Sequence, residues 1–153
     1  MEINREFLRA VNPALEELRA RIGVDFVVFG SAPLYLFGVL EFAGLETLHD
    51  LDVAVGAGFA PTPDMEKVWF HDDPRQPLYK LRLSRLTADI GPAWPGREAI
   101  YARIFREAIE AGGFRFANLA ITREWKDLMV KEYGREKDRL YLEKLEAFLA
   151  KER

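Results

Sequence analysis

Hydrophobic residues recur at helical spacing near both ends of the chain. In residues 3–22 they fall three or four positions apart, which predicts a helix with one buried face. Asn12-Pro13 interrupts this segment, and because asparagine is a favourable N-cap and proline suits the first helical turn, two short helices are the alternative. Residues 123–151 repeat the spacing in two stretches, so we expect a C-terminal pair of helices there.

Short runs of β-branched and aromatic residues occupy the middle of the chain and predict strands. The runs are VDFVVFG (24–30), HDLDVAV (49–55), KVWFH (67–71), YKLRLSRLTADIG (79–91, one long or two short strands) and FRFANLAI (114–121, a strand or an extended connection). Helices are expected over 31–44, starting at Ser31 as N-cap, and over 97–111. This order predicts an α/β (α+β) fold with a mixed central sheet of about four to six strands flanked by helices.

Composition narrows the class of protein further. A chain of 153 residues with 49% hydrophobic residues suits a single domain over 1–153 with a full core. Because the chain has no cysteine, disulfides, thiolate zinc sites and a cysteine nucleophile are excluded. The N-terminus lacks the apolar core of a signal peptide and no run has the length of a membrane span, so we expect a cytoplasmic protein without membrane contact.

Two aspartates, Asp50 and Asp52, lie one residue apart inside an apolar run. Side chains two positions apart in a strand share a face, so their carboxylates converge, whereas His49 should point to the opposite face. Convergent carboxylates repel each other unless a cation lies between them, and oxygen ligands of this kind suit Mg²⁺ or Mn²⁺ together with a substrate phosphate. The alternative is a pair of solvated aspartates at the end of a strand.

Two further features fall beside this pair in chain order. Gly30-Ser31 joins a predicted strand to a predicted helix, where free backbone N–H groups and the helix dipole favour a phosphate; an ordinary turn with a serine cap is the alternative. Asp89 lies in another strand-like run and would provide a third carboxylate for a two-metal site, unless it is a turn residue before Gly91.

The ordered segments FVVFGSAPLYLFG, HDLDVAV and LTADIG together resemble the nucleotidyltransferase fold of the DNA polymerase β-like superfamily. Minimal bacterial members, including nucleotidyltransferase toxins of the abortive-infection type, look most similar. Those members also have a late helical lysine followed by a basic-Lys-Asp stretch, and EWKDLMVKEYGREKDRLYLEKL is similar, which points to Lys131, Lys137 and Asp138. Otherwise these residues are the solvated side of a terminal helix pair. The resemblance covers residues 24–148.

The resemblance implies transfer of a nucleoside monophosphate from an NTP to an acceptor. Gly30 and Ser31 would hold the triphosphate, and Lys131 and Lys137 would contact phosphate or acceptor. Asp50 and Asp52 would bind Mg²⁺ or Mn²⁺, with Asp89 as the third ligand, helping to activate the acceptor hydroxyl.

The chain also departs from the family pattern. An Arg-x-Thr element, common just before the acidic pair, is absent, and no large second domain follows the core, so the acceptor is open among RNA, protein and small molecules. Two alternatives therefore stand beside catalysis. One is a non-catalytic module that binds a nucleotide or a partner. The other is a toxin of a toxin–antitoxin pair, with an antitoxin-like partner.

Overall fold

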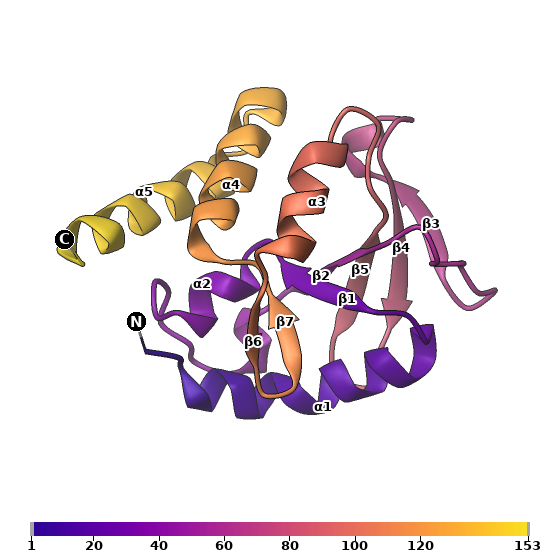
Figure 1. The fold of residues 1–153 in the computed structure, drawn as a ribbon, viewed down its shortest axis with the longest axis horizontal. Helices are drawn as coiled ribbons and strands as arrows, with labels where there is room; N and C mark the ends of the chain where they lie inside the picture. The colour runs from indigo at the N-terminus through magenta and orange to yellow at the C-terminus, as the bar shows by residue number, and fades with distance from the viewer. Residues whose placement is uncertain (1, 153) are drawn as a thin grey trace.

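A mixed, seven-stranded β-sheet forms the centre of the computed structural model, which describes residues 2–152 (Figure 1). The strands are β1 (Phe26–Phe29), β2 (Asp50–Val55), β3 (Glu66–Trp69), β4 (Pro77–Arg82), β5 (Thr87–Gly91), β6 (Ile109–Ala111) and β7 (Phe114–Phe116). Their order across the sheet is β3-β4-β5-β2-β1-β7-β6. The β2–β5 and β1–β7 pairs are parallel and the other neighbours are antiparallel.

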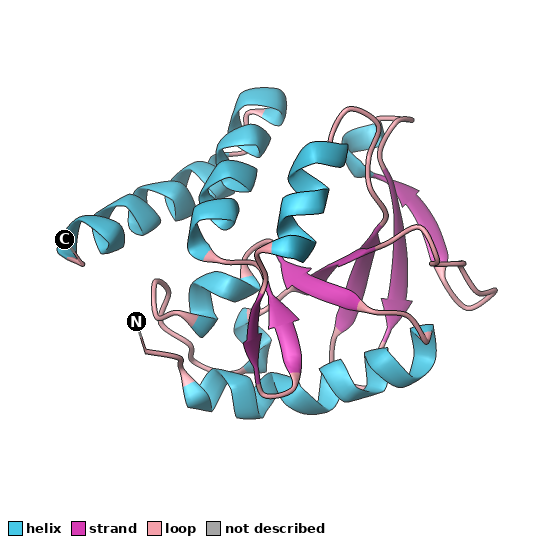
Figure 2. Cartoon of the chain, in the orientation of Figure 1, coloured by secondary structure: helices cyan, strands magenta, loops and turns pink. Residues whose placement is uncertain are grey.

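Helices cover the two faces of this sheet unequally (Figure 2). The helices are α1 (Arg5–Ile22), α2 (Ala32–Leu36), α3 (Glu98–Arg106), α4 (Leu119–Tyr133) and α5 (Glu136–Lys151), with 3₁₀ turns η1 (Leu45–Thr47) and η2 (Phe70–Asp72). The long α1 runs along one face, and α3 and α4 stand over part of the other (Figure 1). The α5 helix packs against α4 and extends away from the sheet.

Alternation along β2 divides the interior into two hydrophobic clusters. Leu51, Val53 and Val55 are buried on the α1 side, whereas Ala54 is buried on the side of α3 and α4. Asp50 and Asp52 therefore share the face of Ala54 and point away from α1. The α1 side is a continuous apolar layer, and the polar residues of β2 are confined to the other face.

The first helix is continuous through Pro13. Asn4 caps it, because its side-chain oxygen accepts a hydrogen bond from the Phe7 N–H at 3.0 Å. Buried side chains lie on both sides of the proline, including Val11 before it and Leu15 after it. Packing of this single face holds the helix across Pro13, so the alternative of two short helices is wrong.

Three predicted boundaries are also wrong. The helix expected over 31–44 ends at Leu36, and the helix expected over 97–111 ends at Arg106. The segment after α3 instead forms the β6–β7 hairpin, because Gly112 and Gly113, with φ of 60° and 84°, supply the left-handed turn that a two-residue hairpin needs. Asn118 rather than a later residue caps α4, accepting from the Ile121 N–H at 2.8 Å.

The α+β class with a mixed sheet is confirmed, but the sheet has more strands than expected. The additional strands come from the hairpin at its edge, whose three-residue strands are too short for a periodic signal. Within residues 2–152, no helix is both long enough and apolar enough to cross a membrane.

Candidate functional site

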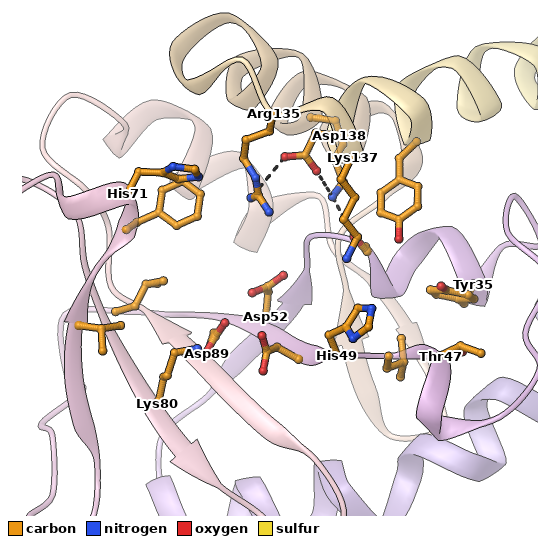
Figure 3. A pocket seen from close by; sticks show the side chains of 18 of the residues that line it. Tyr35, Thr47, His49, Asp52, His71, Lys80, Asp89, Arg135, Lys137 and Asp138 are labelled. Carbon is orange, nitrogen blue, oxygen red and sulfur yellow. Dashed lines mark hydrogen bonds and ion pairs between the residues drawn. The ribbon is translucent and has the colours of Figure 1, made fainter.

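A cleft opens on the face of the sheet that α3 and α4 leave partly uncovered (Figure 3). The two helices pack over Val27, Phe29 and Ala54, so the adjoining ends of β2, β4 and β5 are not covered by this apolar cluster. The cleft has a volume of about 380 Å³. Its charged and titratable lining residues are His49, Asp50, Asp52, His71, Lys80, Asp89, Lys126, Arg135, Lys137 and Asp138, with Tyr35 and Tyr141.

The three predicted carboxylates lie together at the base of this cleft. Asp50 and Asp52 share a face of β2, and Asp52 is the register partner of Asp89 across the parallel β2–β5 pair. Asp89 is only 8% exposed and Asp52 is half-buried, whereas Asp50 is exposed. Asp50 and Asp89 are 39 positions apart in the sequence, the difference between 50 and 89. The pairing of β2 with β5 brings their side chains together.

Negative charge accumulates at these carboxylates. Burial and the charges of Asp89 and Asp50 raise the pKa of Asp52 from 3.8 to about 7, although Lys126 opposes the shift. Burial also raises the pKa of Asp89, with a smaller contribution from Asp50. An added cation would favour the charged forms of both groups, so the electrostatics of the cleft suit a cationic ligand.

A lysine from the next strand already contacts one of them. Lys80 is the antiparallel partner of Asp89 across β4 and β5, and its Nζ lies 2.8 Å from Asp89 Oδ1. The net pKa of Lys80 is raised above its ordinary value. Partial burial acts to lower this pKa, but the hydrogen bond and the charge of Asp89 raise it by more. Sequence reasoning missed Lys80, although its alternation with Tyr79 in a predicted strand was available as a signal.

Gly30 and Ser31 form the turn from β1 into α2 beside these carboxylates. Gly30 has a φ of 74°, and a side chain there would overlap the Asp52 carboxylate, so both the backbone and the space require glycine. Ser31 makes no capping hydrogen bond, contrary to expectation; its Oγ accepts from Lys126 Nζ at 2.8 Å. The α2 helix has five residues, so the expected dipole of a long helix is not available.

A buried ion pair bounds the opposite side of the cleft. Lys126 of α4 donates to Asp138 of α5 at 2.7 Å, and the two residues are 5% and 2% exposed. Arg135 approaches the other Asp138 oxygen at 3.3 Å as an ion pair, yet Oδ2 has no hydrogen bond. Burial lowers the pKa of Lys126 although Asp138 opposes it. The site therefore contains a charged pair with one oxygen still able to accept a hydrogen bond.

The lysines predicted from the resemblance fall in different places. Lys137 is exposed and lines the cleft, with its ammonium 5.6 Å from the centre of the Tyr141 ring. Lys131 does not line the cleft; it is on the exposed side of α4, 2.8 Å from Asp127. Lys126, five positions earlier, occupies the cleft instead. Lys126 lies between Trp125 and Met129, two buried residues of one helical face. This position could have indicated from the sequence that Lys126 is buried.

His49 also lies in the cleft, beside the carboxylates rather than on the opposite face (Figure 3). The prediction extended strand alternation back to this residue, but β2 begins at Asp50. His49 belongs to the bend between η1 and β2, where the two-residue alternation does not apply.

The carboxylates of the cleft fit a divalent cation as a pair and not as a group of three. Within residues 2–152, no three His, Asp or Glu side chains are grouped in a way that could enclose a metal ion. Asp50 and Asp52 nevertheless share one face, while Asp89 contacts Lys80. Mg²⁺ is commonly bound by one or two carboxylates with the remaining ligands from water and substrate phosphate, so the pair fits such an ion.

No protein-family model, curated protein or solved structure matches the chain in comparisons with known proteins. The resemblance to nucleotidyltransferases thus rests on the residues of this sequence and their order. Any function must be argued from the cleft itself.

Proposed function

We propose that the protein is a metal-dependent nucleotidyltransferase, which transfers a nucleoside monophosphate from an NTP to an acceptor that is not yet identified. The observation that carries the proposal is one cleft with two sides of opposite character. Clustered carboxylates of β2 and β5 form one side, and Ser31 with Lys126 and Arg135 forms the other. This combination matches the two chemical parts of a metal–triphosphate ligand.

The carboxylate side is the proposed metal end. Asp50 and Asp52 would hold Mg²⁺ or Mn²⁺ from their shared face of β2. When bound, the ion would supply positive charge to the phosphate oxygens during transfer. The pKa of about 7 for Asp52 supports this assignment, because the group is short of positive charge in the protein alone.

The opposite side is the proposed phosphate end. Lys126 donates to Ser31 and Asp138, so its ammonium is fixed at the β1–α2 turn. Arg135 and Lys137 add positive charge from the start of α5. Cationic side chains in a sheltered site stabilise the charge of a phosphoryl group, which suits binding of a triphosphate between Ser31 and α5.

The proposed reaction breaks the bond between the α-phosphorus and its bridging oxygen to the β-phosphate. An acceptor oxygen forms a new bond to the α-phosphorus, pyrophosphate leaves with the bridging electron pair, and the acceptor proton passes to a base. Asp89 is the proposed base, because it lines the cleft beside the proposed metal ligands and burial raises its pKa above that of a free carboxyl. Lys80 holds its Oδ1, which fixes the orientation of the carboxylate.

A transfer assay tests this function. We expect purified protein with Mg²⁺ and α-labelled NTP to release pyrophosphate and label one of three acceptor pools: total RNA, total protein or a small-molecule extract. Asp50→Asn/Asp52→Asn should lower the rate at least about 10³-fold, since it removes the proposed metal ligands. Asp72→Asn is the matched control, because Asp72 is exposed and does not line the cleft.

Two results would contradict the proposal. Equal labelling by wild type and Asp50→Asn/Asp52→Asn would exclude these carboxylates from the reaction. Nucleotide binding without transfer to any pool would favour the alternative of a non-catalytic nucleotide-binding module.

A further inference from the structure

Lys80 is the cationic side chain that the sheet itself contributes to the lining of the cleft. The other cations among the lining residues, Lys126, Arg135 and Lys137, come from α4, α5 and the turn between them. Alternation along β4 explains its position: Tyr79 packs on the α1 side, and Leu78 and Lys80 face the cleft. Lys80 is thus placed by the fold and not by a flexible loop.

Its ammonium forms an ion pair with Asp89, one of the three carboxylates at the base of the cleft. The Nζ lies 2.8 Å from Asp89 Oδ1, and Asp89 is the register partner of Asp52. The Lys80 side chain is 36% exposed and that of Asp89 is 10% exposed, so the contact is at the cleft surface. If an ammonium and a divalent cation shared the Asp89 carboxylate, they would repel each other strongly.

We propose that Lys80 is a built-in cation of the cleft, which keeps Asp89 out of the metal coordination shell and limits the site to one divalent cation on Asp50 and Asp52. The inference rests on the proposed function, since it concerns the metal site of that reaction. Lys80 acts through Asp89 and is a positioning residue. It compensates part of the carboxylate charge and leaves the Asp50–Asp52 pair for the ion that enters with the nucleotide.

Two observations support this assignment. Within residues 2–152 no three acidic or histidine side chains are grouped for a metal, which is the arrangement expected if Asp89 is held by Lys80. Lys80 also lines the same cleft as Asp50 and Asp52, so its ammonium is on the side of the sheet that carries all three carboxylates.

Binding of Mn²⁺ alone, measured by calorimetry and by electron paramagnetic resonance, tests the proposal without relying on activity. Wild type should bind one ion. Lys80→Met removes the ammonium and keeps the apolar stem, so it should bind a second ion or bind the first at least about tenfold more tightly. Lys80→Arg keeps the charge and should behave as wild type.

Two controls separate Asp89 from a general change in charge. Lys67→Met removes a lysine from the same hairpin, but Lys67 lies over Trp69 at 4.6 Å and does not line the cleft, so it should behave as wild type. Lys80→Met/Asp89→Asn should bind Mn²⁺ as wild type does, without the second ion or the tighter binding expected of Lys80→Met. If Lys80→Met does not fold, Lys80→Gln takes its place with the same expectation.

The outcomes distinguish this inference from the proposed function. If Lys80→Met and wild type bind the same number of ions with the same affinity, and Asp50→Asn/Asp52→Asn abolishes binding in both, the role of Lys80 is wrong and the metal site stands. If neither wild type nor Lys80→Met binds Mn²⁺, alone or with an NTP, the proposed metal site and the role of Lys80 are both overturned.

Discussion

Two lysine–carboxylate pairs lie on opposite sides of the cleft with almost the same geometry. The Nζ–O distance is 2.7 Å for Lys126–Asp138 and 2.8 Å for Lys80–Asp89. Their surroundings differ: the side chains are 6% and 3% exposed in the first pair, against 36% and 10% in the second. Contact distance alone therefore does not describe what each pair does.

The difference appears in the pKa values of the two lysines. Burial lowers the pKa of Lys126 although Asp138 opposes this shift. Lys80 is less buried, so the effect of Asp89 exceeds that of burial and the pKa of Lys80 is raised. A buried pair tolerates the loss of neither partner, because the remaining charge is left without water. In a partly exposed pair, water screens part of the charge that remains when one partner is removed. We infer that Lys126–Asp138 is a fixed part of the cleft, whereas Lys80–Asp89 contributes less to stability.

The largest expected effect comes from breaking the buried pair. Lys126→Met should lower the free energy of unfolding by about 3–5 kcal/mol, because Asp138 would remain buried with only Arg135 beside it. Urea denaturation monitored by circular dichroism measures this change.

The matched double variant Lys126→Met/Asp138→Leu should recover most of that stability, since an apolar pair of similar size avoids the unpaired charge. A loss below about 1 kcal/mol for Lys126→Met would contradict the description of this pair as fixed.

Asp52 lies between the two pairs, and its titration gives the next largest effect. Its folded pKa of about 7 is above the ordinary 3.8, so the folded state binds the extra proton between those values. The resulting stabilisation is complete below pH 4 and is lost as pH rises through 7. The free energy of unfolding of Asp52→Asn should thus be about 1–3 kcal/mol higher than that of wild type at pH 8. Near pH 4 the two free energies should be equal.

Denaturation curves across this pH range check the prediction, and Asp72→Asn, which alters an exposed aspartate outside the cleft, should leave the pH profile unchanged. Equal stability of Asp52→Asn and wild type at pH 8 would show that Asp52 does not carry the excess negative charge inferred for it.

The smallest effect on stability should come from Lys80–Asp89, the less buried of the two pairs. Lys80→Met should lower the free energy of unfolding by about 1 kcal/mol or less, because the Lys80 side chain is partly exposed and the Asp89 carboxyl, with its raised pKa, can take up a proton. Thermal denaturation without metal measures it. A loss as large as that of Lys126→Met would remove the distinction between the two pairs.

Parts of the site with local patterns could be predicted from the sequence. Alternation placed Asp50 and Asp52 on one face, and the strand-like run around Asp89 placed it in a strand. The Gly30-Ser31 turn was found from the change of strand to helix, although its helix proved short because the chain turns at Gly38, with a φ of 79°.

The rest depended on tertiary packing. The pairing of Lys80 with Asp89 follows from strand order and register, which no local pattern determines. The resemblance pointed to Lys131 as the helical lysine, whereas the lysine in the cleft is Lys126, whose partner Asp138 comes from the next helix. His49 was misplaced because the first residue of β2 is set by pairing with β5.

Nucleotide binding tests the central claim most directly, namely that the two sides of the cleft bind the two ends of one metal–triphosphate ligand. Isothermal titration of Mg²⁺-ATP and the other Mg²⁺-NTPs into wild type, Asp50→Asn/Asp52→Asn, Lys126→Met/Asp138→Leu and Asp72→Asn makes the comparison. We predict that wild type and Asp72→Asn bind at least one Mg²⁺-NTP with equal affinity. The other two variants should each bind at least about tenfold more weakly. Unchanged affinity in the Asp50→Asn/Asp52→Asn protein would contradict the account.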